Sequence, residues 1–526
     1  MPAIITDQFR ILNAKNFVND VVVGSANTTN VYYTFVGMPT PDLVEGGGSA
    51  TWTSSPPNPI DSFNEENAYH DSILTLKRIN ENDLTFVIPK IKWEANRVYE
   101  PYRNNYSINN KTPVNEYTTL YNAEYYVLTS DYRVYICLDN GTNASNPSGQ
   151  LSKSEPDFVD VEPQPAGDGS DGYIWKYLFS IKPQDVIKFD SVEYIPVPKN
   201  WGVSGEAKDI KDNAIDGEIK TVFVTETGSN YSTNVSSWDV PILGDGENGV
   251  VNVEVGSDGR VSNITVKNGG TGYTKGTVLF YPNATPELSG LTQVGVASTA
   301  VFEVVIPPKG GHGYDIYREL GANKVMVYSR YDRTVDNNDY ITGNQFSRIG
   351  IIKNPLKNGS TDLLTDQQAS GVGALRLVGS AGSTTAYDPD AIISQTVGIA
   401  STAYGIVVSY DSDSGVLKYI QPTTLSNSNR GYKLHKFTAN PGVGGTTTIQ
   451  RLSGSTTGSN LRIDTTYSGI TTTINSVTKN LGLTFTNGVA NPEIKKYSGE
   501  IIYVDNREPI PRSLTQIEDI RIVIDF

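Results

Sequence analysis

The carboxy-terminal thirty residues constrain this chain more than any other stretch. Apolar residues alternate with other residues at the very end, placing on one face Ile520, Ile522, Ile524 and Phe526. A period of two is typical of a strand with one buried face. Residues 500–504 are rich in β-branched and aromatic side chains and predict a second strand, which we expect Pro509 and Pro511 to end because proline has no ladder donor. Terminal strands this apolar need partners from far upstream.

The length of the chain exceeds what one hydrophobic core usually supports. With 526 residues, at least two domains are expected, and three are a natural division. The 49 glycines and 31 tyrosines favour short strands joined by turns. We therefore predict a mainly β fold with an antiparallel, sandwich-like core and a short N-terminal helix.

The charge pattern argues against direct nucleic acid binding. The formal net charge is −15 at pH 7, and no lysine- or arginine-rich block is present. A surface that follows phosphates needs clustered positive charge. An acidic surface instead suits a component that must stay soluble in a crowded assembly.

The single cysteine, Cys137, cannot form an intrachain disulfide, which indicates folding in a reducing cytoplasm. Residues 1–30 are polar and amphipathic and do not resemble a signal peptide. No apolar run approaches the length that crosses a bilayer, so we expect no membrane insertion.

A helix is predicted over residues 6–20, where Phe9, Leu12 and Phe17 follow helical spacing and Gly24 is expected to end it. Patterning and turn residues also predict a second helix over 65–80 and strands over 30–36, 84–88, 132–138, 173–179 and 192–197.

The sequence changes character at about residue 203, where short strands and glycine turns take over. An internal repeat lies here at a constant offset of 42 residues. It pairs Ile219, Val222, Val224, Gly228 and Tyr231 with Val261, Ile264, Val266, Gly270 and Tyr273. Two copies indicate a small duplicated β module, since a solenoid needs more repeats.

A second change follows at residue 358, where threonine, serine and glycine dominate and residues 406–420 predict a hairpin. We infer a core interrupted twice. Its pieces are 1–202, 311–357 and 491–526, and the inserted β domains are 203–310 and 358–490. Inserts whose ends lie close together at loop tips cost little, so each is expected to be peripheral and its deletion to leave the core folded.

The motifs of common enzymes are absent from the sequence. His70, His312 and His435 are scattered over different modules, and we expect them in loops or on the surface rather than in a triad or zinc site. No G-x-S-x-G elbow or P-loop lysine occurs. Two glycine pairs, Gly270 with Gly272 and Gly371 with Gly373, lack the third glycine of a dinucleotide motif, because Lys275 and Arg376 stand there.

Some chemical alternatives stay open. Asp168, Asp171 and Asp245 lie in glycine-rich loops that could hold calcium, although solvated turns are the favoured interpretation. A glycosidase pair of carboxylates cannot be tested by spacing, since the two acids need only meet in space. Cys137 is interpreted as a structural thiol, because no histidine or basic cluster lies near it in sequence. We predict no catalytic, cofactor or metal site.

Several collinear segments resemble one family. The closing run Ser498–Ile510 and the strand Ile520–Phe526 are similar to the end of the baseplate wedge subunit, present in two copies per wedge, of T-even-like contractile-tailed phages. Further matching segments are 59–62, 87–93, 99–102, 171–179, 193–198, 316–318 and 351–356. They fall in the three core pieces, and the inserts have no counterpart. The enlarged form resembles that of a cyanophage.

The resemblance implies a structural subunit of the virion tail baseplate, assembled in the bacterial host cytoplasm. It implies a homodimer within each wedge, contacts with other wedge proteins around the tail hub, rearrangement on host attachment, and no catalysis. Tyrosine offers a large contact area at a low entropy cost, although it equally favours strands in its own right. The interface candidates are Trp93, Tyr102, Tyr173, Trp175, Tyr503 and Arg507. The alternative is a receptor- or carbohydrate-binding tail protein that acts through the inserts. A third hypothesis is a tail-associated glycosidase.

Overall fold

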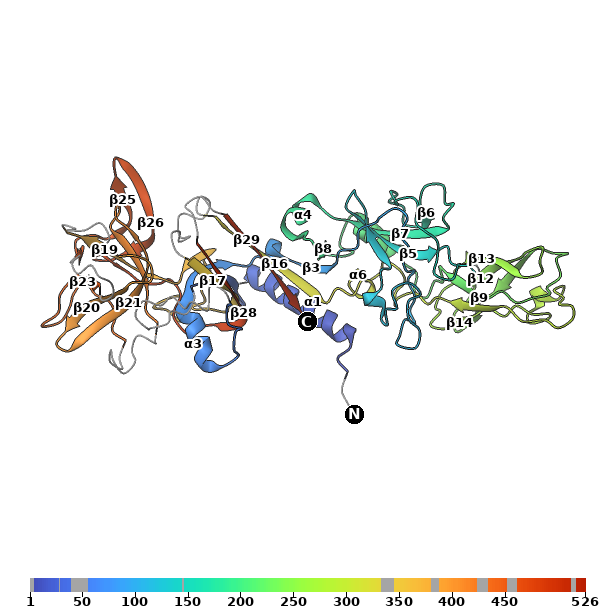
Figure 1. The fold of residues 1–526 in the computed structure, drawn as a ribbon, viewed down its shortest axis with the longest axis horizontal. Coiled ribbons are helices and arrows are strands. Elements are labelled where there is room, and N and C mark those ends of the chain that lie inside the picture. Colours follow the sequence, from blue (N-terminus) through green and yellow to red (C-terminus); the bar gives the residue numbers. More distant parts are fainter. Residues whose placement is uncertain are drawn as a thin grey trace. The chain divides into compact units, whose positions relative to one another are not determined.

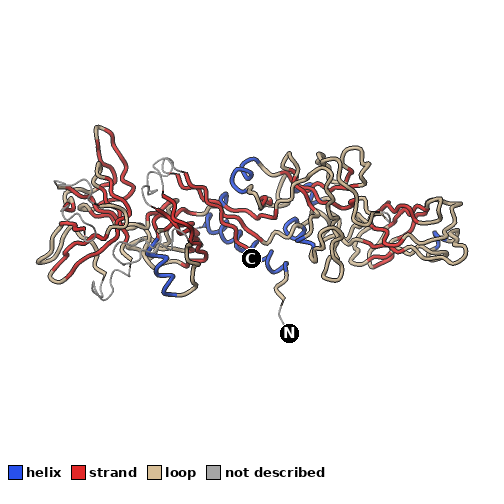
Figure 2. The backbone as a smooth tube through the Cα atoms, in the orientation of Figure 1, coloured by secondary structure: helices blue, strands red, loops and turns tan. Residues whose placement is uncertain are grey.

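The computed structural model describes residues 4–27, 29–38, 55–143, 146–332, 345–379, 387–422, 434–451, 461–511 and 517–526. The protein is 41% strand and 12% helix, and its strands form antiparallel sheets (Figure 2). This confirms the predicted mainly β class. Among the described residues, no helix is both long and apolar enough to cross a lipid bilayer.

The chain divides into two compact units. Unit 1 comprises Met1–Asn16, Thr85–Met326 and Val523–Phe526, and unit 2 comprises Phe17–Leu84 and Val327–Ile522. Four elements contain the crossing points: α1 (Asp7–Asn27), β3 (Leu84–Pro89), β16 (Lys324–Asp332) and β29 (Ile517–Asp525). The inserted range 203–310 lies within unit 1, and 358–490 lies within unit 2. The interrupted-core division itself stays a prediction.

Unit 1 contains an aromatic antiparallel sheet ordered β4-β5-β7-β6 (Figure 1). Its strands are β4 (Tyr126–Leu128), β5 (Arg133–Asn140), β6 (Gln164–Pro165) and β7 (Tyr173–Ser180). The strands predicted over 132–138 and 173–179 are confirmed. Strand β8 (Tyr194–Val197) pairs with β3 and places Ile195 opposite Ile88. The short helices of this unit are α4 (Pro183–Phe189), α5 (Glu206–Asp212) and α6 (Ile316–Glu319).

The range 203–310 forms small two- and three-stranded sheets around one apolar cluster. Its strands are β9 (Val222–Glu226), β10 (Ser237–Pro241), β11 (Leu243–Gly244), β12 (Val250–Val255), β13 (Val261–Asn268), β14 (Gly276–Thr277) and β15 (Val301–Val304). The sheets are ordered β10-β12-β13, β11-β14 and β15-β9.

The two copies of the internal repeat exchange backbone hydrogen bonds. Ile219 N donates to Gly269 O at 3.0 Å, and Val261 N, its counterpart, donates to Thr227 O at 2.9 Å. Residue 269 follows residue 227 by the same offset of 42. Tyr231 N likewise donates to Gly259 O and Tyr273 N to Gly217 O. Each copy therefore completes the other, as expected of a duplicated module.

Unit 2 contains a five-stranded sheet ordered β18-β2-β1-β17-β28. Its strands are β1 (Tyr32–Gly37), β2 (Ile73–Arg78), β17 (Gln345–Lys353), β18 (Gln368–Ser370) and β28 (Glu500–Pro511). The carboxy-terminal strand β28 pairs with β17, beside which it runs in Figure 1, and the amino-terminal strands lie further into the sheet. Helix α3 (Phe63–Ser72) leads directly into β2.

The range 358–490 adds a seven-stranded sheet, ordered β22-β21-β20-β23-β24-β19-β27, and the hairpin β25–β26. The strands are β19 (Gly373–Val378), β20 (Ile392–Gly398), β21 (Ser401–Asp411), β22 (Val416–Ile420), β23 (Thr448–Arg451), β24 (Leu461–Ile463), β25 (Gly469–Ile474), β26 (Val477–Phe485) and β27 (Val489–Ala490). Strands β21 and β22 are antiparallel neighbours, which confirms the predicted hairpin.

Three local predictions are wrong. Residues 73–78 are strand β2, not helix, because they pair with β1 on one side and β18 on the other. Helix α1 continues past Gly24, where a Cβ atom would lie 2.0 Å from Asn30 O, so this glycine serves a close approach. Strand β28 continues to Pro511, because an edge strand tolerates missing donors.

Candidate interaction surface

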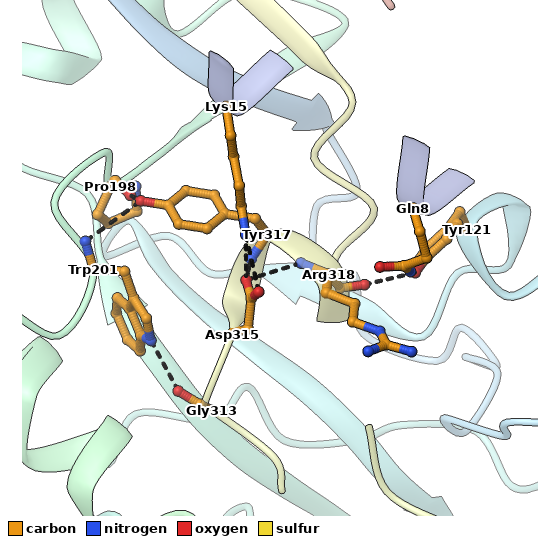
Figure 3. A network of polar contacts seen from close by, with 9 residues as sticks. All are labelled: Gln8, Lys15, Tyr121, Pro198, Trp201, Gly313, Asp315, Tyr317 and Arg318. Atoms are coloured by element: carbon orange, nitrogen blue, oxygen red, sulfur yellow. Dashed lines mark hydrogen bonds and ion pairs between the residues drawn. The ribbon is translucent and has the colours of Figure 1, made fainter. Parts of the chain in front are cut away.

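The first half of α1 is fixed to unit 1 by polar contacts (Figure 3). Lys15 Nζ lies 2.9 Å and 3.2 Å from the two carboxylate oxygens of Asp315. The same ammonium lies 4.8 Å from the centroid of the Tyr317 ring, a cation–π distance. About two turns earlier in the helix, Gln8 Nε2 donates to the Tyr121 hydroxyl at 3.4 Å. These contacts hold one side of the helix.

Asp315 receives Lys15 because it also caps α6. Its Oδ1 accepts from Tyr317 N at 3.1 Å and from Arg318 N at 3.2 Å. A carboxylate at this position satisfies free N–H groups at the helix start. The side chain is therefore oriented by its own turn before it meets Lys15, so little entropy is lost in forming the ion pair.

The partners of α1 are themselves tied to distant segments (Figure 3). The Tyr317 hydroxyl donates to Pro198 O at 2.7 Å, and Trp201 Nε1 donates to Gly313 O at 2.9 Å. The Tyr121 hydroxyl donates to Arg318 O at 2.7 Å. Stretches that are widely separated in sequence thus form one rigid support for the helix.

This support leaves an apolar stripe of the helix in solvent. Ile5 is 63% exposed, Phe9 53% and Leu12 52%. Phe9 and Leu12, three residues apart, lie on one face of α1, and Ile5 belongs to the segment that leads into the helix at Asp7. We call Ile5, Phe9 and Leu12 the α1 stripe. A second apolar row on α1 is buried instead, and consists of Ile11, Ala14, Val18 and Val21.

The helix predicted from the spacing of Phe9 and Leu12 is present, and both side chains lie outside the core. Both rows have helical spacing, and periodicity alone does not tell which row is covered. Exposed apolar side chains that form a contiguous row mark an interaction surface more often than scattered ones.

Beside the support, the Arg318 guanidinium has no hydrogen bond or ion pair to any described residue and lies outside the dashed network of Figure 3.

Three of the predicted interface candidates are core residues. Tyr102 is 4% exposed, and Tyr173 and Trp175 are fully buried. The rings of Tyr173 and Trp175 stack with centroids 5.3 Å apart, and the Tyr102 ring lies edge-on to His312 at 4.8 Å. Their contacts are all used inside unit 1, so their burial leaves no surface for another chain.

The other three candidates keep some accessible surface. Trp93 is half-buried and its Nε1 donates to Ser152 Oγ at 3.0 Å. Tyr503 is partly exposed on β28, and Arg507 is exposed, with Nε donating to Asp505 Oδ2 at 2.7 Å. Trp93 belongs to unit 1, whereas Tyr503 and Arg507 belong to unit 2. The six candidates do not form one cluster within either unit.

Two histidines expected in loops or on the surface are buried. His70 is 7% exposed and lies edge-on to Tyr497, with ring centroids 5.9 Å apart. His312 Nδ1 lies 2.6 Å from Glu319 Oε1, and Gly313 N donates to Glu319 Oε2 at 2.7 Å. Within the described ranges, no three His, Cys, Asp or Glu side chains gather as a metal site would require.

Asp245 and Asp171 satisfy backbone N–H groups of segments that are distant in sequence. Asp245 accepts from Thr274 N at 2.9 Å and from Lys275 N at 3.1 Å, and hydrogen bonds from the Thr274 side chain and backbone lower the pKa of Asp245. Asp171 accepts from Lys153 N at 2.8 Å. Burial raises the pKa of the Cys137 thiol, which keeps it protonated and unreactive.

Comparison with known proteins gives one informative similarity. No protein family model matches the chain. A stretch of 221 residues is 28% identical to baseplate wedge protein gp8 of Enterobacteria phage T4. The match covers 37% of this chain and 60% of that protein. The chain is thus similar to a phage baseplate protein over part of its length.

Proposed function

We propose that this protein is a structural component of a phage tail baseplate wedge. The observation that supports the proposal is the 28% identity over 221 residues to a baseplate wedge protein. The protein would be located in the virion tail, after assembly in the host cytoplasm. Its role is mechanical and includes no catalytic step: it holds contacts between subunits and lets them rearrange on host attachment.

The α1 stripe supplies the surface for such a contact. Its three side chains are more than half exposed, and the helix beneath them is fixed through Lys15 and Asp315. An apolar row that is already ordered on a rigid support loses little conformational entropy when it binds a partner. We assign it to a subunit contact within the wedge, either with a second copy of the chain or with another wedge protein.

The test compares assembly by the wild type with that by a Phe9→Ser/Leu12→Ser double variant. The full chain is expressed with the other wedge proteins of the same phage genome, and complexes are measured by sedimentation and by mass photometry. We expect a complex whose dissociation constant rises at least about tenfold in the variant, since two apolar anchors are lost.

The control is Phe63→Ser in α3, which removes a side chain that is 89% exposed in unit 2. It should assemble like the wild type if the α1 stripe is the contact. A wild-type chain that stays monomeric at high concentration and binds no wedge protein contradicts the proposed function. Equal losses in the control and the double variant contradict the assignment of the stripe.

The carbohydrate-binding alternative has less support. It requires an aromatic platform on the inserted ranges, but most of their described aromatic side chains are in apolar cores. Tyr281, 41% exposed, is the only described aromatic residue of 203–310 or 358–490 that is well exposed. One ring does not make a stacking platform.

A further inference from the structure

Unit 2 contains a cavity of about 410 Å³ with a cationic lining. It lies where the end of β22 and residues 434–436 meet the segment 491–497, with Gly371 and Gly373 at its wall. Lys436, Lys495 and Lys496 all line it. None of the described residues that line it is an aspartate or glutamate. In a chain of net charge −15, a positive cavity is contrary to the overall composition.

One of the three lysines is compensated by the protein. Lys496 Nζ lies 3.0 Å from Asp71 Oδ1 and donates to Gln421 O at 2.6 Å. Lys436 and Lys495 are exposed, and neither side chain has a hydrogen bond or ion pair to the described part of the chain. About two positive charges therefore face the cavity without an internal counter-charge.

A tyrosine hydroxyl in the lining also has no partner within the described protein. Tyr419 is 5% exposed, lines the cavity, and makes no hydrogen bond through its oxygen to any residue that the structure describes. Burial raises the pKa of this phenol, so it remains a donor. A Cβ atom on Gly373 would lie 2.8 Å from the hydroxyl oxygen, so the glycine keeps the space at this donor open. The hydroxyl oxygen is not enclosed by protein, so it can donate to a group that enters the cavity.

The apolar part of the lining limits the ligand further. Ile420, Leu434 and Pro492 contribute to the wall together with the ring of Tyr497. The volume is far greater than one inorganic anion fills and is in the range of cavities that take organic ligands. The ligand should therefore combine an acidic group with an apolar body.

We propose that this cavity binds a carboxylate-bearing ligand, with its acid on Lys436, Lys495 and the Tyr419 hydroxyl and its apolar part on Leu434 and Pro492. Two sources share this chemistry, a free organic acid and an acidic segment of another polypeptide. The proposal does not depend on the proposed baseplate role, because it concerns binding by the isolated full-length chain.

The experiment measures heats of binding to the full-length protein at low salt. The probes are hexanoate, a blocked peptide Gly-Leu-Glu-Asp-Leu-Gly, and its neutral counterpart Gly-Leu-Gln-Asn-Leu-Gly. We expect at least one acidic probe to bind, and the neutral peptide to bind at least about tenfold more weakly than the acidic one if the peptide is the ligand. Preference for the peptide assigns a polypeptide source, and preference for hexanoate assigns a free acid.

Variants locate the binding. Lys436→Gln/Lys495→Gln should weaken the acidic probe about tenfold or more, and Tyr419→Phe should weaken it by a smaller factor. The matched control is Lys309→Gln/Lys479→Gln, which removes the same charge at exposed positions outside the lining. The proposal is overturned if neither acidic probe binds, or if the lysine variant and the control bind alike.

Discussion

At the scale of single residues, His70 shows how burial can dominate the pKa of a side chain. Its ring is 7% exposed, and Nδ1 has no hydrogen-bond partner in the described structure. Burial lowers the pKa of His70 from 6.5 to about 4, against the opposing effect of Asp71. The folded protein therefore keeps this ring neutral at pH values where the unfolded chain would protonate it.

This depressed pKa predicts a loss of stability in mild acid. The contribution is fully present above pH 6.5 and is lost as the pH falls from 6.5 toward 4, because the unfolded state then binds a proton that the folded state excludes. Between pH 7 and pH 5 the free energy of unfolding should fall by about 2 kcal/mol from this residue.

The measurement is chemical denaturation of wild type and His70→Phe across that range. Other groups titrate in both proteins, so the difference between the two profiles isolates residue 70. The variant should lose about 2 kcal/mol less than the wild type between pH 7 and pH 5. Parallel profiles would show that the ring is protonated in the folded state and that its burial is not maintained in solution.

At the scale of elements, the duplicated module of unit 1 uses one device twice. The Tyr231 hydroxyl donates to Phe280 O at 2.9 Å and accepts from Ala300 N at 2.8 Å. The Tyr273 hydroxyl donates to Ile242 O at 2.9 Å and accepts from Gly249 N at 3.1 Å. Each tyrosine thus supplies both partners that a strand neighbour would otherwise provide.

The equivalence predicts similar costs for removing either hydroxyl. Tyr231→Phe and Tyr273→Phe each leave one buried N–H and one buried carbonyl with a lost partner, so each should destabilise unit 1 by about 1–3 kcal/mol. Thermal and denaturant unfolding of the full chain measure this. Tyr281→Phe, at a ring that is 41% exposed, is the control and should be nearly neutral. A neutral result at one of the two buried sites would mean that the copies are not equivalent.

Elements also show what local sequence can and cannot predict. The strands β5 and β7 were predictable because alternation and aromatic content agree with their pairing. Residues 73–78 were not, because β18, almost three hundred residues later, helps to decide their state. The helical spacing of Phe9 and Leu12 was visible in the sequence. Which of the two apolar rows of α1 is covered depends on what packs against the helix, and this was not predictable. The lysine-lined cavity was not predictable, since Lys436 and the pair Lys495 and Lys496 come from two segments that are distant in sequence.

At the scale of the whole molecule, the boundary at residue 358 does not separate the second insert from the core sheet. Strand β18 lies inside 358–490, yet it pairs with β2 at the edge of the five-stranded sheet. One apolar cluster joins Met38 and Leu74 to Val372, Ile406, Val408 and Ile420. The inserted range therefore covers side chains that would otherwise be exposed.

This shared cluster changes what deletion of 358–490 should do. Removal would uncover Leu74, which is fully buried, and would leave β2 as an unpaired sheet edge. We expect unit 2 to lose its cooperative unfolding transition and the protein to aggregate.

Because a deletion can fail for many reasons, the single substitution Leu74→Ala provides a finer measure and should lower the free energy of unfolding by about 2–5 kcal/mol. Leu243→Ala, at a side chain 37% exposed, is the matched control and should cost well under half as much. A deletion protein that melts cooperatively at the wild-type temperature, together with a small effect of Leu74→Ala, would show that the insert is peripheral and that the shared cluster contributes little to holding unit 2 together.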